Sequence, residues 1–455
     1  MFNFNDKTRL KNIFFFVILP VFFVSQTLGQ VNTSVKHPEW SYNQTIYEIN
    51  TRQFSIEGTF KAVEKEIPRL KKMGVGIVWL MPVHPIGEKN RKGTLGSYYS
   101  VKDYLAVDPA YGTIADLKSL VKTVHANSMH LIIDWVANHT AWDNKLAKEH
   151  PEYYTKDSLG NFIPPVPDWK DVIDLNYDNI GLRTYMINAM KFWIKDCNID
   201  GFRCDVADMV PTDFWIEARK ELDKVKPVFL LAEAEKPELH EKCFDMTYSW
   251  GLFNIVKKIA VGENNPTQLR TFFEKERKTF PEDAFRMRFT ENHDENSWKG
   301  SAIEKLGNAA EMLAVFNAVI PGLPLVYNGQ EACNIKRLDF FEKDPIQWKD
   351  CNLKNVYTKI LNLKKSNKAL LNGKQGGKLI EVKSDKDSTV YSFTRENRKD
   401  KIFVVFNMSS KPVDVNLTGK EMAGRYKELF TGESTELKNS ANMKLDAWGY
   451  KVFLK

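Results

Sequence analysis

Gly201-Phe202-Arg203-Cys204-Asp205-Val206-Ala207-Asp208 reads as a buried strand that delivers an arginine and a carboxylate to one edge of a fold. Arg203 and Asp205 are two residues apart, so on a strand both side chains point to the same face. An aspartate in an apolar strand is costly unless it is paired, and a neighbouring arginine keeps the carboxylate ionised and oriented. This arrangement suits a nucleophile, although an isolated Arg-x-Asp pair is more often structural.

The surrounding chain alternates apolar strands with amphipathic helices, which is the pattern of a parallel sheet with crossover helices. Helices are predicted at 60–73, 114–127 and 182–196, among others. Eight strands are predicted, at 46–50, 75–80, 131–134, 199–205, 228–233, 243–250, 285–290 and 324–328. Eight such alternations predict a (β/α)8 barrel, whose active sites lie at the carboxyl ends of the strands.

Polar residues at the ends of these strands favour the functional interpretation of Arg203 and Asp205. They occur in three further stretches: Asp134-Trp135-Val136-Ala137-Asn138-His139, Leu230-Leu231-Ala232-Glu233 and Phe289-Thr290-Glu291-Asn292-His293-Asp294. A structural accident would scatter such residues, whereas a barrel brings them to one edge.

Two segments lie outside the alternation of strands and helices. An excursion rich in Pro, Asp, Trp and Tyr follows the third strand, which predicts a small inserted domain at 141–178. Short period-two strands separated by Lys, Asp and Asn turns predict a C-terminal antiparallel β-domain at 371–455. The barrel itself is expected at 41–140 and 179–370, in a chain of the α/β class.

The composition is that of a globular protein able to bury a large core, with 43% hydrophobic and 27% charged residues. Residues 1–29 are typical of a secretory signal peptide, because Lys7, Arg9 and Lys11 precede an apolar run at 13–24. That run is short for a membrane span, and an uncleaved anchor is the alternative. We expect a secreted or periplasmic protein with no membrane span in the mature chain.

Charge and cysteine content argue against a nucleic-acid-binding protein, a zinc-binding protein and a disulfide-rich protein. Removal of residues 1–29 lowers the formal charge from +7 to +5, and the lysines are scattered, so nucleic-acid binding has no support. The five cysteines form neither a zinc spacing nor a disulfide framework, and their odd number leaves at least one free. Cys204, inside the predicted core strand, is interpreted as a small apolar filler.

A carboxylate beside an arginine, a second carboxylate one strand away and a third next to a histidine are the groups that glycoside hydrolysis requires. The chain resembles the alpha-amylase superfamily of retaining glycoside hydrolases. The four sequence regions of that family read here as D-W-V-A-N-H at 134–139, G-F-R-C-D at 201–205, the glutamate of L-A-E at 231–233, and F-T-E-N-H-D at 289–294. The resemblance covers almost the whole mature chain. It implies a TIM barrel with a domain inserted after strand three and a C-terminal β-sandwich.

The resemblance also implies catalytic roles. Asp205 would be the nucleophile that forms a covalent glycosyl-enzyme, Glu233 the general acid and then base, and Asp294 a stabiliser of the transition state. Burial near other carboxylates would supply the raised pKa that a protonated Glu233 needs. Glu235, two residues on, is the alternative acid, and only the strand-end position favours Glu233. The implied substrate-binding residues are Tyr99, His139, Arg203 and His293.

A calcium site is a further implication of the resemblance. The family builds it from the asparagine of the first region, here Asn138, and an aspartate of the inserted domain, here Asp174. The backbone oxygen of Met209 would stand where the family uses a histidine carbonyl, which needs no particular side chain. Calcium is the only cofactor that the resemblance suggests.

Departures from the family pattern bear on the substrate. Many alpha-amylases have a lysine and a histidine three and four positions after the nucleophile, where this chain has Asp208 and Met209. Binding on the leaving-group side would then depend on stacking and on the insert, including Trp142 or Trp169.

We expect a secreted alpha-amylase-type hydrolase that cleaves α-1,4-glucosidic bonds of starch and maltooligosaccharides with retention. The alternatives are cyclomaltodextrinase, neopullulanase or alpha-glucosidase specificity, a transglycosylase, and a non-catalytic carbohydrate-binding relative. The last of these usually lacks a catalytic carboxylate, and this chain keeps all three.

Overall fold

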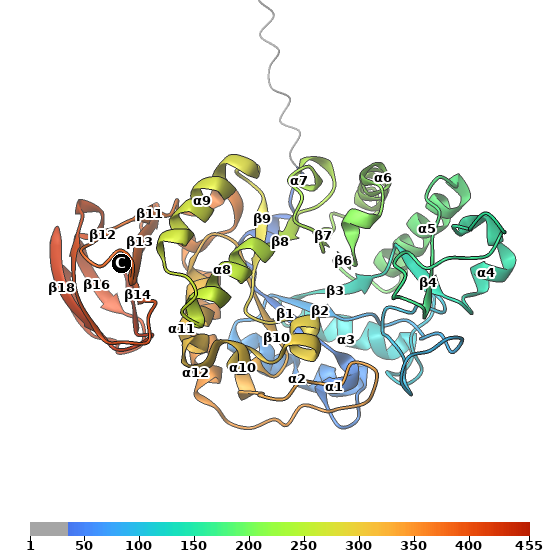
Figure 1. Cartoon of the computed structure of the whole chain (residues 1–455), viewed down its shortest axis with the longest axis horizontal. Helices are drawn as coiled ribbons and strands as arrows, with labels where there is room; N and C mark the ends of the chain where they lie inside the picture. The colour runs from blue at the N-terminus through green and yellow to red at the C-terminus, as the bar shows by residue number, and fades with distance from the viewer. Residues whose placement is uncertain (1–34) are drawn as a thin grey trace, which may run out of the picture. The chain divides into compact units, whose positions relative to one another are not determined.

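A closed barrel of eight parallel strands forms the centre of the computed structural model, which describes residues 35–455 (Figure 1). Around the barrel the strands follow the order β1-β10-β9-β8-β7-β6-β3-β2. Their bounds are β1 Ile46–Ile49, β2 Ile77–Leu80, β3 His130–Trp135, β6 Gly201–Cys204, β7 Phe229–Ala232, β8 Met246–Tyr248, β9 Phe285–Arg288 and β10 Leu323–Tyr327. The predicted (β/α)8 barrel is confirmed. The predicted signal peptide, residues 1–29, lies outside the described residues.

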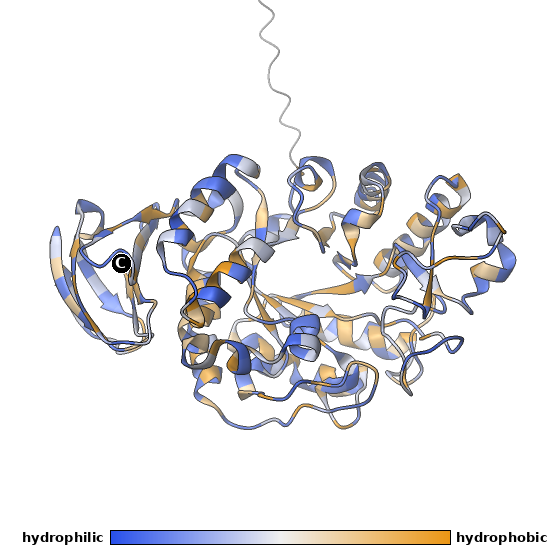
Figure 2. Ribbon diagram, viewed as in Figure 1, coloured by the Kyte–Doolittle hydropathy of each residue, from blue (hydrophilic) through white to orange (hydrophobic). Residues whose placement is uncertain are grey.

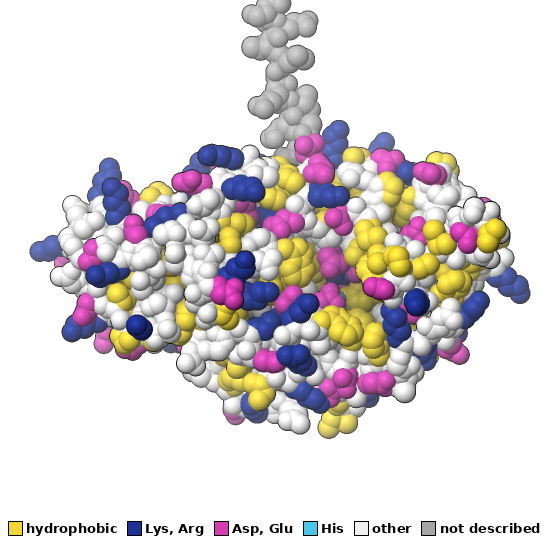
Figure 3. Space-filling model, in the orientation of Figure 1, with side chains coloured by type: hydrophobic (Ala, Val, Ile, Leu, Met, Phe, Trp, Pro, Cys, Tyr) yellow, Lys and Arg dark blue, Asp and Glu magenta, His cyan; other side chains and the backbone are white. Residues whose placement is uncertain are grey.

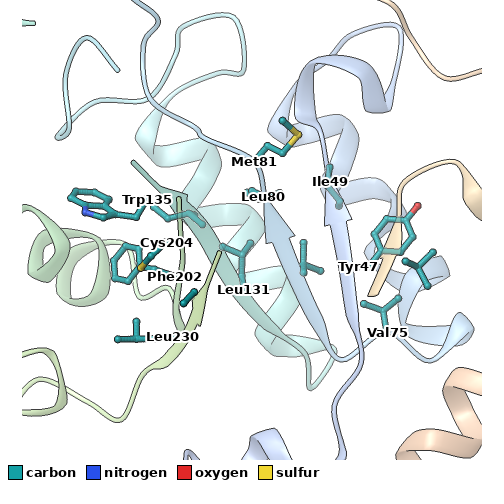
Figure 4. Packing of buried hydrophobic residues seen from close by; sticks show 14 of the residues in the cluster. Tyr47, Ile49, Val75, Leu80, Met81, Leu131, Trp135, Phe202, Cys204 and Leu230 are labelled. Atoms are coloured by element: carbon teal, nitrogen blue, oxygen red, sulfur yellow. The ribbon is translucent and has the colours of Figure 1, made fainter. Parts of the chain in front are cut away.

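Alternate residues of each strand belong to two separate cores, because successive side chains of a strand point to opposite faces. Ile46, Ile77 and Ile132 are fully buried in a cluster inside the barrel. Their neighbours Tyr47 and Leu131 join a larger cluster between the strands and the helices, part of which Figure 4 shows. Burial on both faces explains why these strands are almost continuously apolar, as Figure 2 shows by colour.

Helices join successive strands and cover the outside of the barrel (Figure 1). They are α1 Thr51–Phe54, α2 Phe60–Met73, α3 Ile114–Ala126, α5 Ile180–Asp196, α6 Thr212–Asp223, α7 Leu239–Lys242, α8 Trp250–Ala260, α9 Thr267–Thr279, α10 Ala302–Leu306, α11 Ala310–Val319 and α12 Asn352–Ser366. Helix α2 illustrates how the sequence sets the ends of these helices. The Thr59 side chain accepts a hydrogen bond from Ala62 N at its start, and Gly74 ends it in the left-handed conformation, with φ of 101°. No helix in the described part of the chain is long and apolar enough to cross a membrane.

The excursion after β3 contains a two-stranded antiparallel sheet and one short helix. Strand β4 His139–Ala141 pairs with β5 Val172–Asp174, with His139 opposite Asp174, and α4 spans Lys145–Glu149. The Leu175 N–H donates to the Asn138 carbonyl at 3.1 Å, which ties the end of the excursion to the end of β3. The inserted element thus stands beside the carboxyl ends of the barrel strands.

The C-terminal part consists of two antiparallel sheets, as predicted. A six-stranded sheet, in the order β11-β13-β14-β19-β16-β17, packs on a three-stranded sheet in the order β12-β15-β18. The bounds are β11 Ile380–Glu381, β12 Lys383–Ser384, β13 Val390–Asn397, β14 Asp400–Asn407, β15 Val413–Thr418, β16 Gly424–Glu428, β17 Ser434–Leu437, β18 Ser440–Leu445 and β19 Tyr450–Leu454. The other face of β14 joins the barrel's outer core, where the rings of Phe316 and Phe406 lie 5.5 Å apart.

One disulfide is present that the cysteine spacings did not reveal. Cys333 and Cys351 are bonded, with Cα atoms 6.0 Å apart, and they close a loop over a sequence separation of 18. Cys197, Cys204 and Cys243 are free and buried. The burial of Cys204 agrees with its interpretation as an apolar filler.

Candidate active site

The predicted catalytic residues meet at the carboxyl ends of the barrel strands. Asp205 directly follows β6, and Glu233 directly follows β7. Backbone hydrogen bonds continue the parallel ladder through both positions, from Asp205 N to Trp135 O and from Glu233 N to Cys204 O, each at 3.0 Å. The ladder therefore fixes the backbone positions from which the Asp205 and Glu233 side chains extend.

The Arg203 guanidinium holds three carboxylates together in the interior of this end. Its Nη1 donates to Asp205 Oδ1 at 2.7 Å and to Asp134 Oδ1 at 2.9 Å. Its Nη2 forms an ion pair with Glu233 Oε2 at 2.9 Å. Arg203 is fully buried, so these contacts are screened little by water. A single cation thus fixes Asp205 and Glu233 relative to each other.

Burial raises the proton affinity of both strand-end carboxyl groups. It raises the pKa of Glu233 to about 7, against the opposing charge of Arg203. It also raises the pKa of Asp205, to about 6, and Arg203 again opposes the rise. A carboxyl group with a pKa of about 7 can hold a proton at neutral pH, which a general acid requires.

Val206, the residue after Asp205, has a backbone conformation that branched residues rarely adopt, with φ of 35°. Its N–H donates to Glu233 Oε2 at 2.9 Å. Backbone strain of this kind persists where the surroundings enforce it, and it clusters at functional sites. Here the strained turn aims a backbone donor at the proposed acid.

A second group of contacts surrounds His293, which follows β9 together with Asp294. His293 Nε2 lies 2.7 Å from the Tyr99 hydroxyl and 3.2 Å from Asp294 Oδ2, and Nδ1 lies 2.5 Å from Glu48 Oε1. The Tyr99 hydroxyl also donates to Asp134 Oδ2 at 3.1 Å, which joins this group to the Arg203 cluster. Burial raises the pKa of Asp294, but the neighbouring His293 outweighs it and holds that pKa below its ordinary value.

These groups open onto a cavity of about 250 Å³. Aromatic side chains and the three carboxylates with predicted catalytic roles line it: Tyr99, His139, Trp169, Trp298, Phe340, Phe341, Asp205, Glu233 and Asp294. Figure 3 shows acidic and hydrophobic side chains gathered near the middle of the face drawn there. Aromatic faces with nearby carboxylates suit a pyranose ring, which has both C–H surface and hydroxyl groups.

The inserted element contributes His139 and Trp169 to the cavity, with ring centroids 5.4 Å apart. Burial lowers the pKa of His139 to about 4, so its ring is neutral at physiological pH. Trp142 is not among the lining residues, since its Nε1 donates to the Lys170 carbonyl and its ring lies 5.3 Å from Lys89 Nζ. Of the two tryptophans named from the sequence, Trp169 is the one at the site.

Residues that departed from the family pattern lie outside the cavity lining. Asp208 and Met209 belong to a short 3-10 helix, Ala207–Met209, and both are exposed. Lys236 Nζ approaches Asp208 Oδ2 at 3.8 Å. Glu235 also points away from the cavity, because its carboxylate pairs with Arg286 at 2.6 Å. Glu233 is therefore the glutamate of that segment that faces the cavity.

The expected calcium ligands Asn138 and Asp174 lie near each other, because His139 pairs with Asp174 between β4 and β5. The backbone carbonyl of Asn138 accepts from Leu175 N, and the Asn138 amide nitrogen lies 3.3 Å from His139 Nδ1. Within residues 35–455 no three His, Cys, Asp or Glu side chains come together in a way that could hold a metal ion. Calcium takes 6–8 oxygen ligands. Backbone carbonyls and waters count among those ligands, so calcium at Asn138 and Asp174 stays a prediction, and no chemical step here is derived through a metal.

Several residues of the site were not identified from the sequence: Trp298, Phe340 and Phe341 of the cavity lining, and Tyr248 and Glu48 behind it. Tyr248 on β8 lies with its hydroxyl 3.3 Å from Arg203 Nε, and Glu48 on β1 is fully buried against His293. Glu48 did carry a signal, since it is the one charged residue of a four-residue strand that is otherwise apolar or aromatic. Burying such a charge is expensive unless it serves a purpose.

Comparison with known proteins agrees with this geometry. The model of the family described as "Alpha amylase, catalytic domain" matches residues 22–172 and 167–401, and the "Alpha amylase, C-terminal all-beta domain" matches residues 380–450. Alpha-amylase 2 of Dictyoglomus thermophilum is 27% identical over 435 residues, which cover 87% of this chain and 74% of that protein.

Solved structures give the same result. A noncanonic maltogenic alpha-amylase from Thermotoga neapolitana is 32% identical, with a TM-score of 0.83 over 90% of this chain and 98% of that one. An alpha-amylase from Lactobacillus plantarum is 30% identical, with a TM-score of 0.82 over 91% and 99% of the two chains. A neopullulanase of Thermoactinomyces vulgaris and a cyclomaltodextrinase of Thermoanaerobacter pseudethanolicus match at 23% and 22% identity, over 87% and 86% of this chain and 74% and 75% of those proteins. Because the catalytic-domain model alone matches well over half of its residues, the chain belongs to the alpha-amylase family and is a glycoside hydrolase.

Proposed function

We propose that this protein cleaves α-1,4-glucosidic bonds of starch and maltooligosaccharides with retention of the anomeric configuration. The observation that carries the proposal is the shared contact of Arg203 with Asp205 and Glu233 at the floor of an aromatic cavity. Burial raises the pKa of Glu233 to about 7, which suits a general acid, and Asp205, held by Arg203 at the end of the neighbouring strand, would be the nucleophile.

In the first step an Asp205 carboxylate oxygen attacks the anomeric carbon of the bound sugar. The bond from that carbon to the glycosidic oxygen breaks, and Glu233 gives its proton to the departing oxygen. The product is a glycosyl ester of Asp205, with Glu233 now ionised. Arg203 contacts both groups and stabilises the charge that moves between them.

In the second step Glu233 takes a proton from water, and the hydroxide oxygen attacks the anomeric carbon. The ester bond to Asp205 breaks, which restores both carboxyl groups to their starting state. Tyr99, His139, His293 and Asp294 surround the same cavity and would hold the sugar hydroxyls and cover its apolar face.

Product stereochemistry tests the retaining mechanism. Proton NMR of maltooligosaccharide hydrolysis should show the α-anomer first, followed by slow mutarotation to the equilibrium mixture. A first product with the β-configuration would require inversion, in which water attacks directly. That result would remove the nucleophilic role of Asp205.

A second candidate is the specificity of cyclomaltodextrinases, neopullulanases or maltogenic amylases. It is favoured by the relatives that carry those names and by the exposure of Asp208 and Met209, which leave the leaving-group side without the common lysine and histidine contacts. Looser positioning on that side would tolerate cyclic or branched chains. An alpha-glucosidase and a transglycosylase remain the further alternatives.

Initial rates on amylose, cyclodextrin and an aryl α-glucoside separate these specificities. We expect amylose to be cleaved to short maltooligosaccharides, with some activity on cyclodextrin. Cyclodextrin cleaved much faster than amylose would make this a cyclomaltodextrinase. Rapid release of glucose from the aryl glucoside, with negligible attack on amylose, would make it an exo-acting alpha-glucosidase. Longer oligosaccharides formed from maltotriose would reveal transglycosylation.

The proposal includes secretion, or export to a periplasm. Support comes from the basic and apolar pattern of residues 1–29 and from the Cys333–Cys351 disulfide, since such bonds persist in oxidising compartments. Fractionation of the producing cells tests this directly. Activity that stays with the cytosol would refute it, and activity that stays with the membrane would indicate an uncleaved anchor.

A further inference from the structure

His293 has a carboxylate oxygen near each of its two ring nitrogens. Nδ1 lies 2.5 Å from Glu48 Oε1, and Nε2 lies 3.2 Å from Asp294 Oδ2. A neutral imidazole has one N–H, whereas both nitrogens donate in the charged form. The charged ring is the form that satisfies both carboxylates at once.

Hydrogen bonds of Tyr99 point to the same protonation state. Its hydroxyl lies 2.7 Å from His293 Nε2 and has Asp134 Oδ2 as a second partner at 3.1 Å. A hydroxyl has only one proton to donate. If that proton goes to the Asp134 carboxylate, the Tyr99 oxygen accepts from His293, and Nε2 must carry a hydrogen.

The remaining neighbours of His293 bring one further cation. Trp79, on β2, meets the ring edge-on at 6.1 Å and is uncharged. Arg203, on β6, is the nearby positive charge, and it is already paired with Asp134, Asp205 and Glu233. The carboxylates of Glu48 and Asp294 therefore have His293 as their common counter-ion.

A glutamate at position 48 is unfavourable for the stability of the fold. It is fully buried on β1, and its Oε2 has no hydrogen-bond partner among the described residues. Leaving a buried carboxylate oxygen unpaired carries a desolvation penalty. Such a residue in the middle of a barrel strand calls for a functional explanation.

We infer that Glu48 is a positioning residue that keeps His293 doubly protonated, so that Nε2 always carries a hydrogen beside Tyr99 and Asp294. The inference rests on the proposed function, because it assigns Glu48 to the same site. Glu48 is not among the residues that line the cavity, so it would act through His293. A fixed imidazolium holds Asp294 ionised and oriented, ready to stabilise positive charge on the sugar ring in the transition state.

Electrostatics of the buried pair agree with this reading. Burial lowers the pKa of His293, but the charges of Asp294 and Glu48 outweigh it and leave the pKa well above its ordinary value. Burial raises the pKa of Glu48, and the positive charge of His293 opposes the rise. The carboxylate and the imidazolium thus stabilise each other's charged forms.

Nitrogen-15 NMR of the full-length protein, labelled at histidine, tests the inference without measuring activity. The His293 signals, assigned by their loss in His293→Asn, should show both ring nitrogens protonated from about pH 5 to about pH 9. A His293 with a single protonated nitrogen at about pH 7 in the wild-type protein would overturn the inference. Starch cleavage by that same sample would show that the proposed function survives.

The Glu48→Gln variant adds a kinetic test, since glutamine keeps the acceptor for Nδ1 but removes the charge. We expect His293 to titrate within the same pH range in this variant. The value of kcat/KM should fall on the order of tenfold at about pH 8 and recover towards wild type at about pH 6. A variant whose His293 stays doubly protonated, or whose rate falls equally at every pH, would show a merely structural role.

Glu331→Gln is the matched control. Glu331 is likewise a buried glutamate, and its Oε1 accepts from the Tyr47 hydroxyl and from Arg69 rather than from a histidine. Its replacement removes one buried charge at a similar risk to folding. The His293 signals and the shape of the pH–rate profile should stay as in the wild-type protein. A shift equal to that of Glu48→Gln would overturn the assignment to Glu48.

Discussion

Replacement of Glu233 by glutamine is expected to abolish turnover and yet stabilise the protein at alkaline pH. Burial raises the pKa of Glu233 from 4.5 to about 7, so the folded chain holds this proton more tightly than the unfolded chain. Its stabilising contribution is complete below about pH 4.5 and is lost as the pH rises through about 7. A tenfold change in proton affinity corresponds to about 1.4 kcal/mol, so ionised Glu233 costs the fold about 3 kcal/mol by about pH 8. Glutamine has no proton to lose and avoids this cost.

Melting temperatures of the wild-type protein and Glu233→Gln at about pH 5 and about pH 8 measure the effect. The difference between the two proteins should move in favour of the variant by a few °C at the higher pH. The control is Glu276→Gln. Burial raises the pKa of Glu276, but Arg288 and Arg286 outweigh it and hold that pKa below its ordinary value, so this variant should lose similar stability at both pH values. A Glu233→Gln protein that is more strongly destabilised at about pH 8 than at about pH 5 would refute the reasoning.

Three further outcomes are expected. Asp205→Asn should lower kcat by at least about a thousandfold with unchanged circular dichroism, because the amide has the same shape but is a poor nucleophile; activity close to wild type would remove its role. Trp169→Ala should raise KM for maltooligosaccharides about fivefold through lost stacking, while Trp142→Ala, outside the cavity lining, leaves KM unchanged; equal effects of both would contradict the placement. If calcium binds at Asn138 and Asp174, EDTA should lower the melting temperature and added calcium restore it, and an unchanged melting temperature would exclude a removable structural ion.

The barrel could be predicted from the sequence because parallel strands buried on both faces read as apolar runs. The prediction was least accurate at β8, expected at 243–250 and observed as Met246–Tyr248. Cys243 is the C-cap residue of the preceding helix, and Ser249 is the N-cap residue of the next one. The two helices therefore take up both ends of the predicted strand and leave only its middle in β8. The two strands of the insert escaped prediction, since a strand of three residues is too short to show periodicity.

Site residues that directly follow a predicted strand, such as Asp205 and Glu233, could be identified from the sequence. Contacts between distant segments could not be predicted. Glu48 and His293 are 245 residues apart, and only the closed barrel, in which β10 alone separates β1 from β9, brings their side chains into contact. The Cys333–Cys351 disulfide was not predicted either. It lies in a stretch with no repeating pattern, where the spacing of cysteines does not reveal which two are bonded.

That disulfide has a consequence for the wall of the cavity. The loop that it closes carries Phe340 and Phe341, which form one wall of the cavity, and contains neither helix nor strand. Its Ile346 N–H is held by the Gln53 carbonyl at 2.8 Å, so the loop is fastened at both ends and in the middle. Further hydrogen bonds join Gln53 to the carbonyls of Asp339 and Glu342. The wall that carries Phe340 and Phe341 is therefore held in place by a covalent bond and side-chain contacts, without pairing to a strand.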